Sequence, residues 1–259
     1  MSTPHLYYEV HGTSGPHLLL VHGMLSSRAQ WIPNIDAMSS FCRPVVVELF
    51  GHGRSPSPDE PEHYSPDHYV REFENIRRDI DARRWSTCGQ SLGASLTLRY
   101  GLTHPDRVGA QVFTNSRSAL SEESYDGFLE VLKKQLARDG QRFMDNFPLH
   151  PSKSKRLPED IKKAMVRDAV LATVEGFGNT MLYTVPQCSL RSRLEQIRLP
   201  TLMIVGRYDK RFAPLRDIAA RMIPGLEIRD LEGGHAINID AADAFNSAVR
   251  DFLLRFDDE

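Results

Sequence analysis

Apolar runs along the chain alternate with segments of mixed apolar and polar residues. The apolar runs predict buried strands. Leu18–Val21 is a continuous apolar run, and Pro44–Leu49 is a second, mostly apolar one. Runs of this kind are typical of strands that helices cover on both faces of a sheet. Five further strands are expected at residues 5–10, 84–89, 108–114, 199–206 and 226–231.

The segments between these runs predict helices. The clearest helix start is Ser65-Pro66-Asp67, where a capping hydroxyl precedes a proline and an acid. This helix is expected to end near Ala82. Further helices are expected at residues 26–38, from Ser91 to Pro105, at 214–222 and at 240–256. The alternation predicts an α/β fold with a mainly parallel central sheet flanked by helices.

The middle of the chain departs from this alternation. Residues 116–193 contain no buried strand run, and four helices are expected there, at 122–138, 141–147, 158–172 and 175–183. We therefore expect a helical cap inserted at 116–193 into an α/β core made of residues 1–115 and 194–259. A loop within the insertion carries Lys153, Lys155 and Arg156, which we interpret as a solvated surface in preference to a phosphate site.

Length, charge and cysteine content limit the possible size, partners and location of the protein. The 259 residues suffice for one large domain, or for one domain with an insertion. The net charge of −2 and the lack of a long basic run disfavour nucleic acid and anionic membranes. We expect neither a signal peptide nor a membrane span. Three widely separated cysteines, Cys42, Cys88 and Cys188, favour a reducing cytoplasm, and their spacing predicts no metal site.

The stretch Gly89-Gln90-Ser91-Leu92-Gly93 is the first candidate for chemistry. A serine between two glycines suits a sharp turn from a strand into a helix, which exposes the hydroxyl at the helix N-terminus. The pentapeptide alone is weak evidence, because it also fits an ordinary glycine-rich turn. It predicts a nucleophile only if an acid and a histidine follow in the right places.

Asp209 and His235 meet that requirement. Asp209 follows the strand expected at 199–206, and His235 lies in a Gly-Gly loop before the last helix. Functional residues of parallel sheets collect at the carboxyl ends of the strands, so Ser91, Asp209 and His235 are expected to meet there. His235 would take the proton of Ser91, and Asp209 would orient the imidazole.

Other residues near His235 could also supply the acid. Asp230, Glu232 and Asp240 are also close to His235 in the sequence. Asp209 is preferred because its loop lies at the correct edge of the sheet. Asn115 ends the preceding strand, where some proteins of this type carry their acid, so no carboxylate competes at that position.

Two backbone N–H groups are the expected donors to a developing oxyanion. One is that of Leu92, directly after the serine, and the other is that of Met24, in the loop after the first buried strand. His22, in the same loop, is interpreted as a structural brace.

The chain resembles the α/β-hydrolase superfamily, in the carboxylesterase-like branch with a serine nucleophile and a helical cap. The segments that carry the resemblance are Leu18–Met24, Gly51–Ser55, Gly89–Ala94, Leu199–Asp209 and Gly233–Asn238. The resemblance implies an acyl-serine intermediate and no cofactor. It also argues against the dehalogenase and epoxide hydrolase branches, whose nucleophile is an aspartate. The chain departs from the family pattern at Glu48 and Phe50, where relatives often have aspartate and proline.

We expect a serine hydrolase that acts on a small to medium carboxylic ester. A lactonase, a thioesterase, a meta-cleavage-type C–C bond hydrolase and a slowly turning-over ligand receptor remain alternatives with the same triad. Candidate substrate-binding residues are Leu25, Phe50, Arg117, Phe212 and Ile237. Core packing is an equal alternative for the apolar ones, and a salt bridge is the favoured alternative for Arg117.

Overall fold

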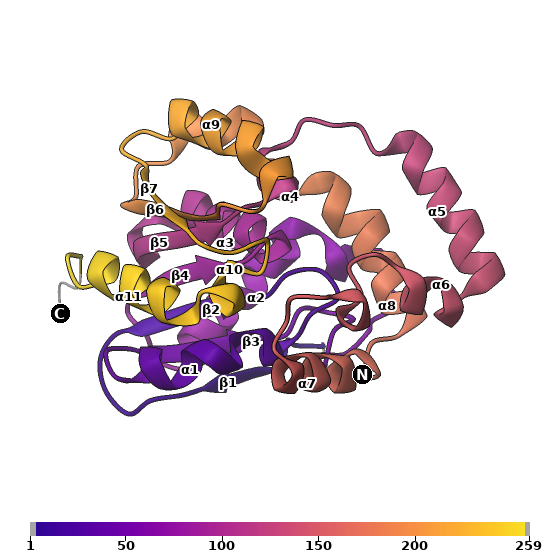
Figure 1. Cartoon of the computed structure of the whole chain (residues 1–259), viewed down its shortest axis with the longest axis horizontal. Helices are drawn as coiled ribbons and strands as arrows, with labels where there is room; N and C mark the ends of the chain where they lie inside the picture. The colour runs from indigo at the N-terminus through magenta and orange to yellow at the C-terminus, as the bar shows by residue number, and fades with distance from the viewer. Residues whose placement is uncertain (1–3, 257–259) are drawn as a thin grey trace.

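The strands form a single sheet in the computed structural model of the protein, which describes residues 4–256 (Figure 1). The sheet order is β1-β3-β2-β4-β5-β6-β7. The strands are β1 (Tyr8–Val10), β2 (His17–Val21), β3 (Arg43–Val47), β4 (Trp85–Gly89), β5 (Val108–Thr114), β6 (Thr201–Gly206) and β7 (Glu227–Leu231). Neighbouring strands are parallel, except that β1 pairs antiparallel with β3. The predicted mainly parallel α/β fold is confirmed.

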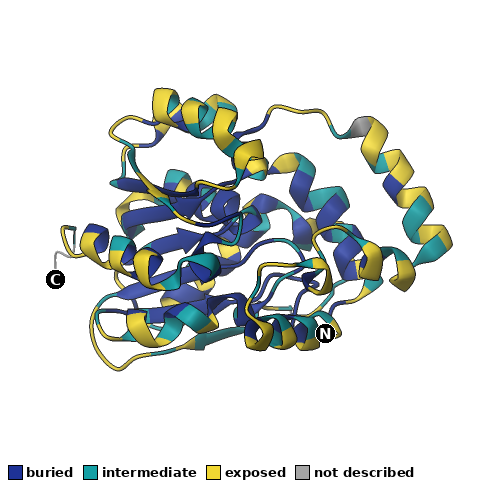
Figure 2. Ribbon diagram, viewed as in Figure 1, coloured by how far each residue is buried: buried dark blue, intermediate teal, exposed yellow. Residues whose placement is uncertain are grey.

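Alternate residues of the central strands pack on opposite faces of the sheet. Leu18 and Leu20 of β2 belong to one apolar cluster, whereas Leu19 and Val21 belong to another. Both clusters are buried, and the strands form the dark core of Figure 2. The covering helices are α1 (Ile32–Ser39) and α11 (Ala242–Leu253) on one face and α2 (Pro66–Asp79), α3 (Leu92–Thr103) and α9 (Ala213–Met222) on the other.

The register of β2 against β4 fixes the geometry of the candidate site. Val21 and Gly89 are direct partners at the carboxyl ends of these two parallel strands. The loops that follow, which begin at His22 and Gln90, therefore leave the sheet side by side. This places the Met24 loop next to Ser91.

Local chemistry explains where two predicted helices begin. Ser65 caps α2 by accepting a hydrogen bond from the His68 N–H, with Pro66 as the first helical residue. The single helix expected at 26–38 is instead a 3₁₀ turn, η1 (Arg28–Trp31), followed by α1. Pro33 near the start of α1 has no N–H to continue the preceding turn, so the helix restarts there.

Every described element between β5 and β6 is helical. These elements are α4 (Arg117–Leu120), α5 (Asp126–Asp139), α6 (Gln141–Asn146), η4 (Pro151–Lys153), α7 (Glu159–Ala169), α8 (Val174–Asn179), the π-helical turn η5 (Thr180–Thr184), η6 (Val185–Gln187) and η7 (Arg191–Gln196). Gly140 separates α5 from α6 with a φ of +47°. We call this stretch the helical insertion; α5 to α8 lie together at one side of the sheet in Figure 1.

Short elements complete the fold. They are the 3₁₀ turns η2 (Pro61–Tyr64), η3 (Pro105–Arg107) and η8 (Lys210–Phe212) and the helix α10 (Ile237–Asp240). Within residues 4–256, no helix is both long and apolar enough to cross a membrane.

Candidate active site

Ser91 lies in the sharp turn between β4 and α3. Its φ of +52° and ψ of −108° are strained for a residue with a side chain. Close packing holds the turn, because a Cβ on Gly93 would lie only 2.3 Å from the Val21 carbonyl oxygen. The Ser116 hydroxyl donates to the Ser91 carbonyl at 2.6 Å, and the Ser91 N–H donates to Thr114 Oγ1 at 3.3 Å. Tertiary contacts thus maintain a backbone conformation that serine would otherwise avoid.

The three residues expected to act together form one continuous chain of contacts. His235 Nε2 lies 3.0 Å from Ser91 Oγ, and His235 Nδ1 lies 2.7 Å from Asp209 Oδ2. Asp209 follows β6, and His235 follows β7. A carboxylate only accepts hydrogen bonds, so Nδ1 carries the proton and Nε2 is the acceptor for the serine hydroxyl.

Three neighbours fix the orientation of the acid and the imidazole. Asn115 Nδ2 donates to Asp209 Oδ2 at 3.0 Å, so this amide supports the acid from the end of the adjacent strand. The Phe212 ring stacks on the His235 ring with centroids 4.7 Å apart. Gln90 Nε2 donates to the His235 carbonyl at 3.0 Å and ties its loop to the serine turn.

The Met24 N–H is a free backbone donor in the loop after β2. The Gly23 N–H donates to Gln30 Oε1, and the Leu25 N–H donates to His52 Nε2, both at 3.1 Å. Among the described residues, the intervening Met24 N–H has no acceptor. Met24 lines the same cavity as Ser91, so this N–H is available to a bound molecule.

A second backbone donor is free at the serine turn itself. The Gly93 N–H donates to the Gln90 carbonyl at 2.8 Å, and the Ala94 N–H donates to the Ser91 carbonyl at 3.2 Å. Leu92 begins α3, and within residues 4–256 its N–H meets no acceptor. The two N–H groups predicted as oxyanion donors, those of Met24 and Leu92, thus both lack an acceptor within residues 4–256.

Two buried histidines brace the Met24 loop. His22 Nε2 accepts from the Leu49 N–H at 3.0 Å, and its Nδ1 lies 2.7 Å from the Gly23 carbonyl oxygen. Burial lowers the pKa of His22 to about 3 and that of His52 to about 4. Both rings are therefore neutral near pH 7 and serve as hydrogen-bonding struts, as expected for His22.

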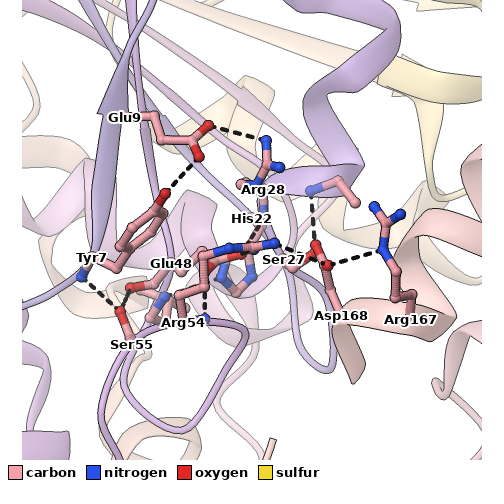
Figure 3. Close-up of polar contacts among 12 residues, drawn as sticks. Tyr7, Glu9, His22, Ser27, Arg28, Glu48, Arg54, Ser55, Arg167 and Asp168 are labelled. Atoms are coloured by element: carbon pink, nitrogen blue, oxygen red, sulfur yellow. Dashed lines mark hydrogen bonds and ion pairs between the residues drawn. The ribbon is translucent and has the colours of Figure 1, made fainter. Parts of the chain in front are cut away.

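A polar cluster with two buried carboxylates connects the far end of the same loop to the helical insertion (Figure 3). Ser27 Oγ donates to Asp168 Oδ2 of α7 at 2.8 Å. Arg54 lies between two buried carboxylates, with Nη1 3.2 Å from Glu48 Oε1 and Nη2 3.4 Å from Asp168 Oδ1. The Arg28 N–H also donates to Glu48. Burial raises the pKa of Glu48, because it disfavours the charged form.

The sequence analysis missed Asp168, although a signal for it exists. Ile161, Met165 and Asp168 are the buried residues of α7, and they share one face because they are spaced by four and three residues. A carboxylate in an apolar stripe requires a buried partner. The identity of that partner depends on how the insertion folds back onto the core.

A cavity of about 390 Å³ opens over Ser91. Met24, Leu25 and His235 line it from the core, and Met165 and most of the segment 148–157 line it from the insertion. The volume lies within the range of small-molecule sites. Lys153, Lys155 and Arg156 are exposed, as expected of a solvated loop, but they also form part of this wall.

The expected substrate-binding residues divide into two groups. Leu25 lines the cavity. Phe212 is not among the described residues of the wall, but its ring stacks on that of His235. Phe50, Ile237 and Arg117 are also not among the described residues that form the wall, so nothing in its lining supports a substrate contact for these three.

Packing and pairing explain these three positions. Phe50 is fully buried against the rings of Tyr64 and Tyr69. Ile237 is buried in the apolar cluster on the α1 and α11 face of the sheet. Arg117 forms an exposed ion pair with Glu123, the alternative that the sequence favoured for it.

No group of three or more His, Cys, Asp or Glu side chains is arranged to hold a metal ion in the described part of the chain.

Comparison with known proteins identifies the family. The sequence model of the α/β hydrolase fold matches residues 16–242. The chain belongs to this family. A Bacillus subtilis protein named as a 2-succinyl-6-hydroxy-2,4-cyclohexadiene-1-carboxylate synthase is 26% identical over 91% of the chain and 89% of its own length. The carboxylesterase YbfK of the same organism is 23% identical over 92% of the chain and 80% of its own length.

Solved structures of this hydrolase fold agree with the architecture. The enol-lactonase of Burkholderia xenovorans LB400 superposes with a TM-score of 0.81 at 23% identity, over 96% of both chains. At this identity the likeness establishes the fold.

Proposed function

We propose that the protein is a serine hydrolase that cleaves a small to medium carboxylic ester through an acyl intermediate on Ser91. The observation that carries the proposal is the contact chain from Ser91 Oγ through His235 to Asp209, with contacts of 3.0 and 2.7 Å, at the floor of a cavity. A serine hydroxyl becomes a good nucleophile when an adjacent base accepts its proton, and this geometry supplies the base.

In the first step, Ser91 Oγ attacks the ester carbonyl carbon while His235 Nε2 takes the hydroxyl proton. The carbonyl oxygen becomes an oxyanion, which accepts hydrogen bonds from the N–H groups of Met24 and Leu92. One such donor is typically worth roughly 10²–10³ in rate. Asp209 stabilises the imidazolium formed at His235.

In the second step, the tetrahedral intermediate collapses and the bond to the leaving oxygen breaks. His235 gives its proton to that oxygen, so the alcohol leaves and the acyl group stays on Ser91. Water then attacks the acyl carbon as His235 takes a proton from it, and the collapse of the second intermediate returns that proton to Ser91. The products are a carboxylic acid and an alcohol, and the residues are restored.

The choice of an ester is supported by the relative named as a carboxylesterase. The volume of the cavity, about 390 Å³, supports a small to medium substrate. We also propose that residues 116–193 act as a cap, because their segment 148–157 and Met165 supply the wall opposite the serine. A lactonase, a thioesterase and a C–C bond hydrolase would use the same three residues on substrates with a different bond to be broken.

The test is a matched substrate panel with wild type and Ser91→Ala. We expect wild type to hydrolyse p-nitrophenyl esters of two to six carbons, and Ser91→Ala to lose at least about 10³-fold in kcat. Lactones, thioesters and vinylogous diketones in the same panel separate the alternatives. Ester hydrolysis that is absent from wild type, or retained by Ser91→Ala, would contradict the proposal.

A further inference from the structure

One wall of the cavity over Ser91 is cationic. Lys153, Lys155 and Arg156 line it, and we call these three the basic rim. They belong to the loop between α6 and α7, so the helical insertion brings them to the same cavity as Ser91 and His235. The rim therefore faces the site of the proposed reaction.

Arg156 lies next to the residues that directly precede His235 and Asp209. Its Nη1 lies so near Gly234 that a Cβ on that glycine would be only 2.6 Å away. Its guanidinium carbon lies 5.6 Å from the centre of the Tyr208 ring. Gly234 directly precedes His235, and Tyr208 directly precedes Asp209. A cation from the insertion thus lies against both loops that carry the acid and the base.

The hydrogen-bonding capacity of the rim is largely unused. Within residues 4–256, neither the guanidinium of Arg156 nor Nζ of Lys155 has a hydrogen-bond acceptor or a carboxylate at ion-pair distance. Lys153 Nζ donates at 3.0 Å to the neutral amide of Asn146. A guanidinium with five free donors is suited to bidentate binding of a carboxylate or phosphate.

The other titratable groups on the wall do not cancel this charge. Asp240 is the acidic residue among those lining the cavity, and its Oδ2 accepts the Gly234 N–H at 2.6 Å. Burial lowers the pKa of His150, so this ring stays neutral at pH 7. Three cations and one carboxylate therefore face the cavity, which gives its wall a net positive charge.

We propose that the substrate carries a compact anionic group, a carboxylate or a phosphate, which Arg156 binds together with Lys155 while the ester carbonyl lies at Ser91. The inference rests on the proposed ester hydrolysis and specifies its substrate class. Monoesters of dicarboxylic acids and acyl esters of phosphorylated alcohols both fit. The anion remains outside the reaction and determines affinity and orientation.

The experiment compares kcat/KM within two pairs of substrates, with acid release followed in a pH-stat. Monomethyl glutarate is paired with methyl valerate, in which a methyl replaces the carboxylate. 2-Acetoxyethyl phosphate is paired with butyl acetate. We expect wild type to prefer the charged member of one pair by at least about tenfold, since a hydrogen bond to a charged group is worth roughly ten- to hundredfold. The pair that shows the preference distinguishes carboxylate from phosphate.

Arg156→Gln tests the assignment to the rim. We expect this variant to lose about tenfold or more on the preferred charged ester, mainly through KM, and to change less than about twofold on its neutral partner. Raising NaCl should reduce the wild-type preference, because the rim is exposed to solvent. Lys134→Gln, which removes an exposed cation from α5, is the matched control and should leave the preference unchanged.

Two results would overturn the inference, and a third would overturn the proposed ester hydrolysis on which it rests. Wild type that hydrolyses the neutral esters at least as well as the charged ones contradicts an anion site. An equal loss on both members in Arg156→Gln shows that the residue affects the site generally. If wild type hydrolyses neither member of either pair, or any ester of the panel above, the proposed ester hydrolysis fails, and this inference fails with it.

Discussion

Asp209, the acid of the proposed triad, is mostly buried and is held in one orientation by its hydrogen bonds. The Asp209 side chain is 10% exposed, and its Oδ2 is shared by His235 Nδ1 at 2.7 Å and Asn115 Nδ2 at 3.0 Å. An amide from the neighbouring strand thus supports the oxygen that orients the imidazole. The role of the carboxylate is to hold one tautomer and to balance the charge of the imidazolium.

Asp209→Asn tests that role without removing bulk. We expect kcat to fall roughly 10³–10⁴-fold, because an amide at this position favours the wrong tautomer of His235. Circular dichroism and the thermal unfolding midpoint should stay close to those of wild type. The matched control is Asp230→Asn, since Asp230 is the rival acid that lies in an ion pair with Arg216. Loss of activity in the control and not in Asp209→Asn would assign the acid elsewhere.

At the scale of elements, the loop after β2 is supported from two directions. Buried histidines hold it from within the core, and Asp168 of α7 holds Ser27 from the insertion. The cavity wall also spans both parts, so the insertion contributes to the site through α7 and through the loop before it. Docking of α7 and the position of the Met24 N–H are therefore expected to be coupled.

Asp168→Ala measures that coupling. It removes the acceptor of Ser27 and one of the two carboxylates that face Arg54. We expect the free energy of unfolding to fall by about 1–3 kcal/mol and kcat on neutral esters to fall more than KM rises. Asp160→Ala, in the exposed first turn of the same helix, is the control and should have a small effect on both quantities. Equal kinetics in the two variants would show that α7 does not affect the oxyanion site.

At the scale of the whole molecule, two neutral histidines couple the stability of the core to pH. The pKa of His22 is lowered to about 3 and that of His52 to about 4, from the ordinary value of 6.5. Between about pH 4 and 6.5, the unfolded chain binds protons at these positions that the folded protein excludes. The free energy of unfolding therefore falls as pH is lowered through this window.

The expected slope is large enough to measure. Each excluded proton contributes up to about 1.4 kcal/mol per pH unit. The free energy of unfolding can be measured with urea for wild type and His52→Gln at pH 7.5, 6.0 and 5.0. It should depend less steeply on pH in the variant, and the difference in slope should correspond to roughly one proton. The other histidines are common to both proteins, so they cancel in the comparison. An identical slope in the two proteins would mean that His52 is protonated in the folded state.

The sequence predicted the fold and the meeting of Ser91, Asp209 and His235 better than the lining of the cavity. Short apolar runs that alternate with helices identified the strands, and the carboxyl ends of parallel strands then brought Ser91, Asp209 and His235 within reach of one another. Backbone donors next to the serine follow from the same turn geometry. These features depend on the local sequence and on the sheet topology. Both can be inferred from the order and periodicity of the apolar segments.

The contacts between the insertion and the core could not be predicted in this way. Asp168 meets Ser27 across 141 residues of sequence, and Arg156 reaches Gly234 from a loop whose polar composition indicated only solvent exposure. Phe50 follows a buried strand, and its side chain is fully buried against the rings of Tyr64 and Tyr69 of a later segment. These contacts depend on how the helices of the insertion pack against the core. Helical periodicity shows which face of a helix is apolar, but it does not determine which partner that face meets.

We propose that Ser91 is a nucleophile activated by His235. The most direct measurement is the mass of the intact protein after treatment with a fluorophosphonate, followed by mapping of the modified peptide. We expect one adduct, located on Ser91 and absent from Ser91→Ala. An adduct on another residue, an adduct that persists in Ser91→Ala, or no reaction of the folded wild-type protein would contradict it.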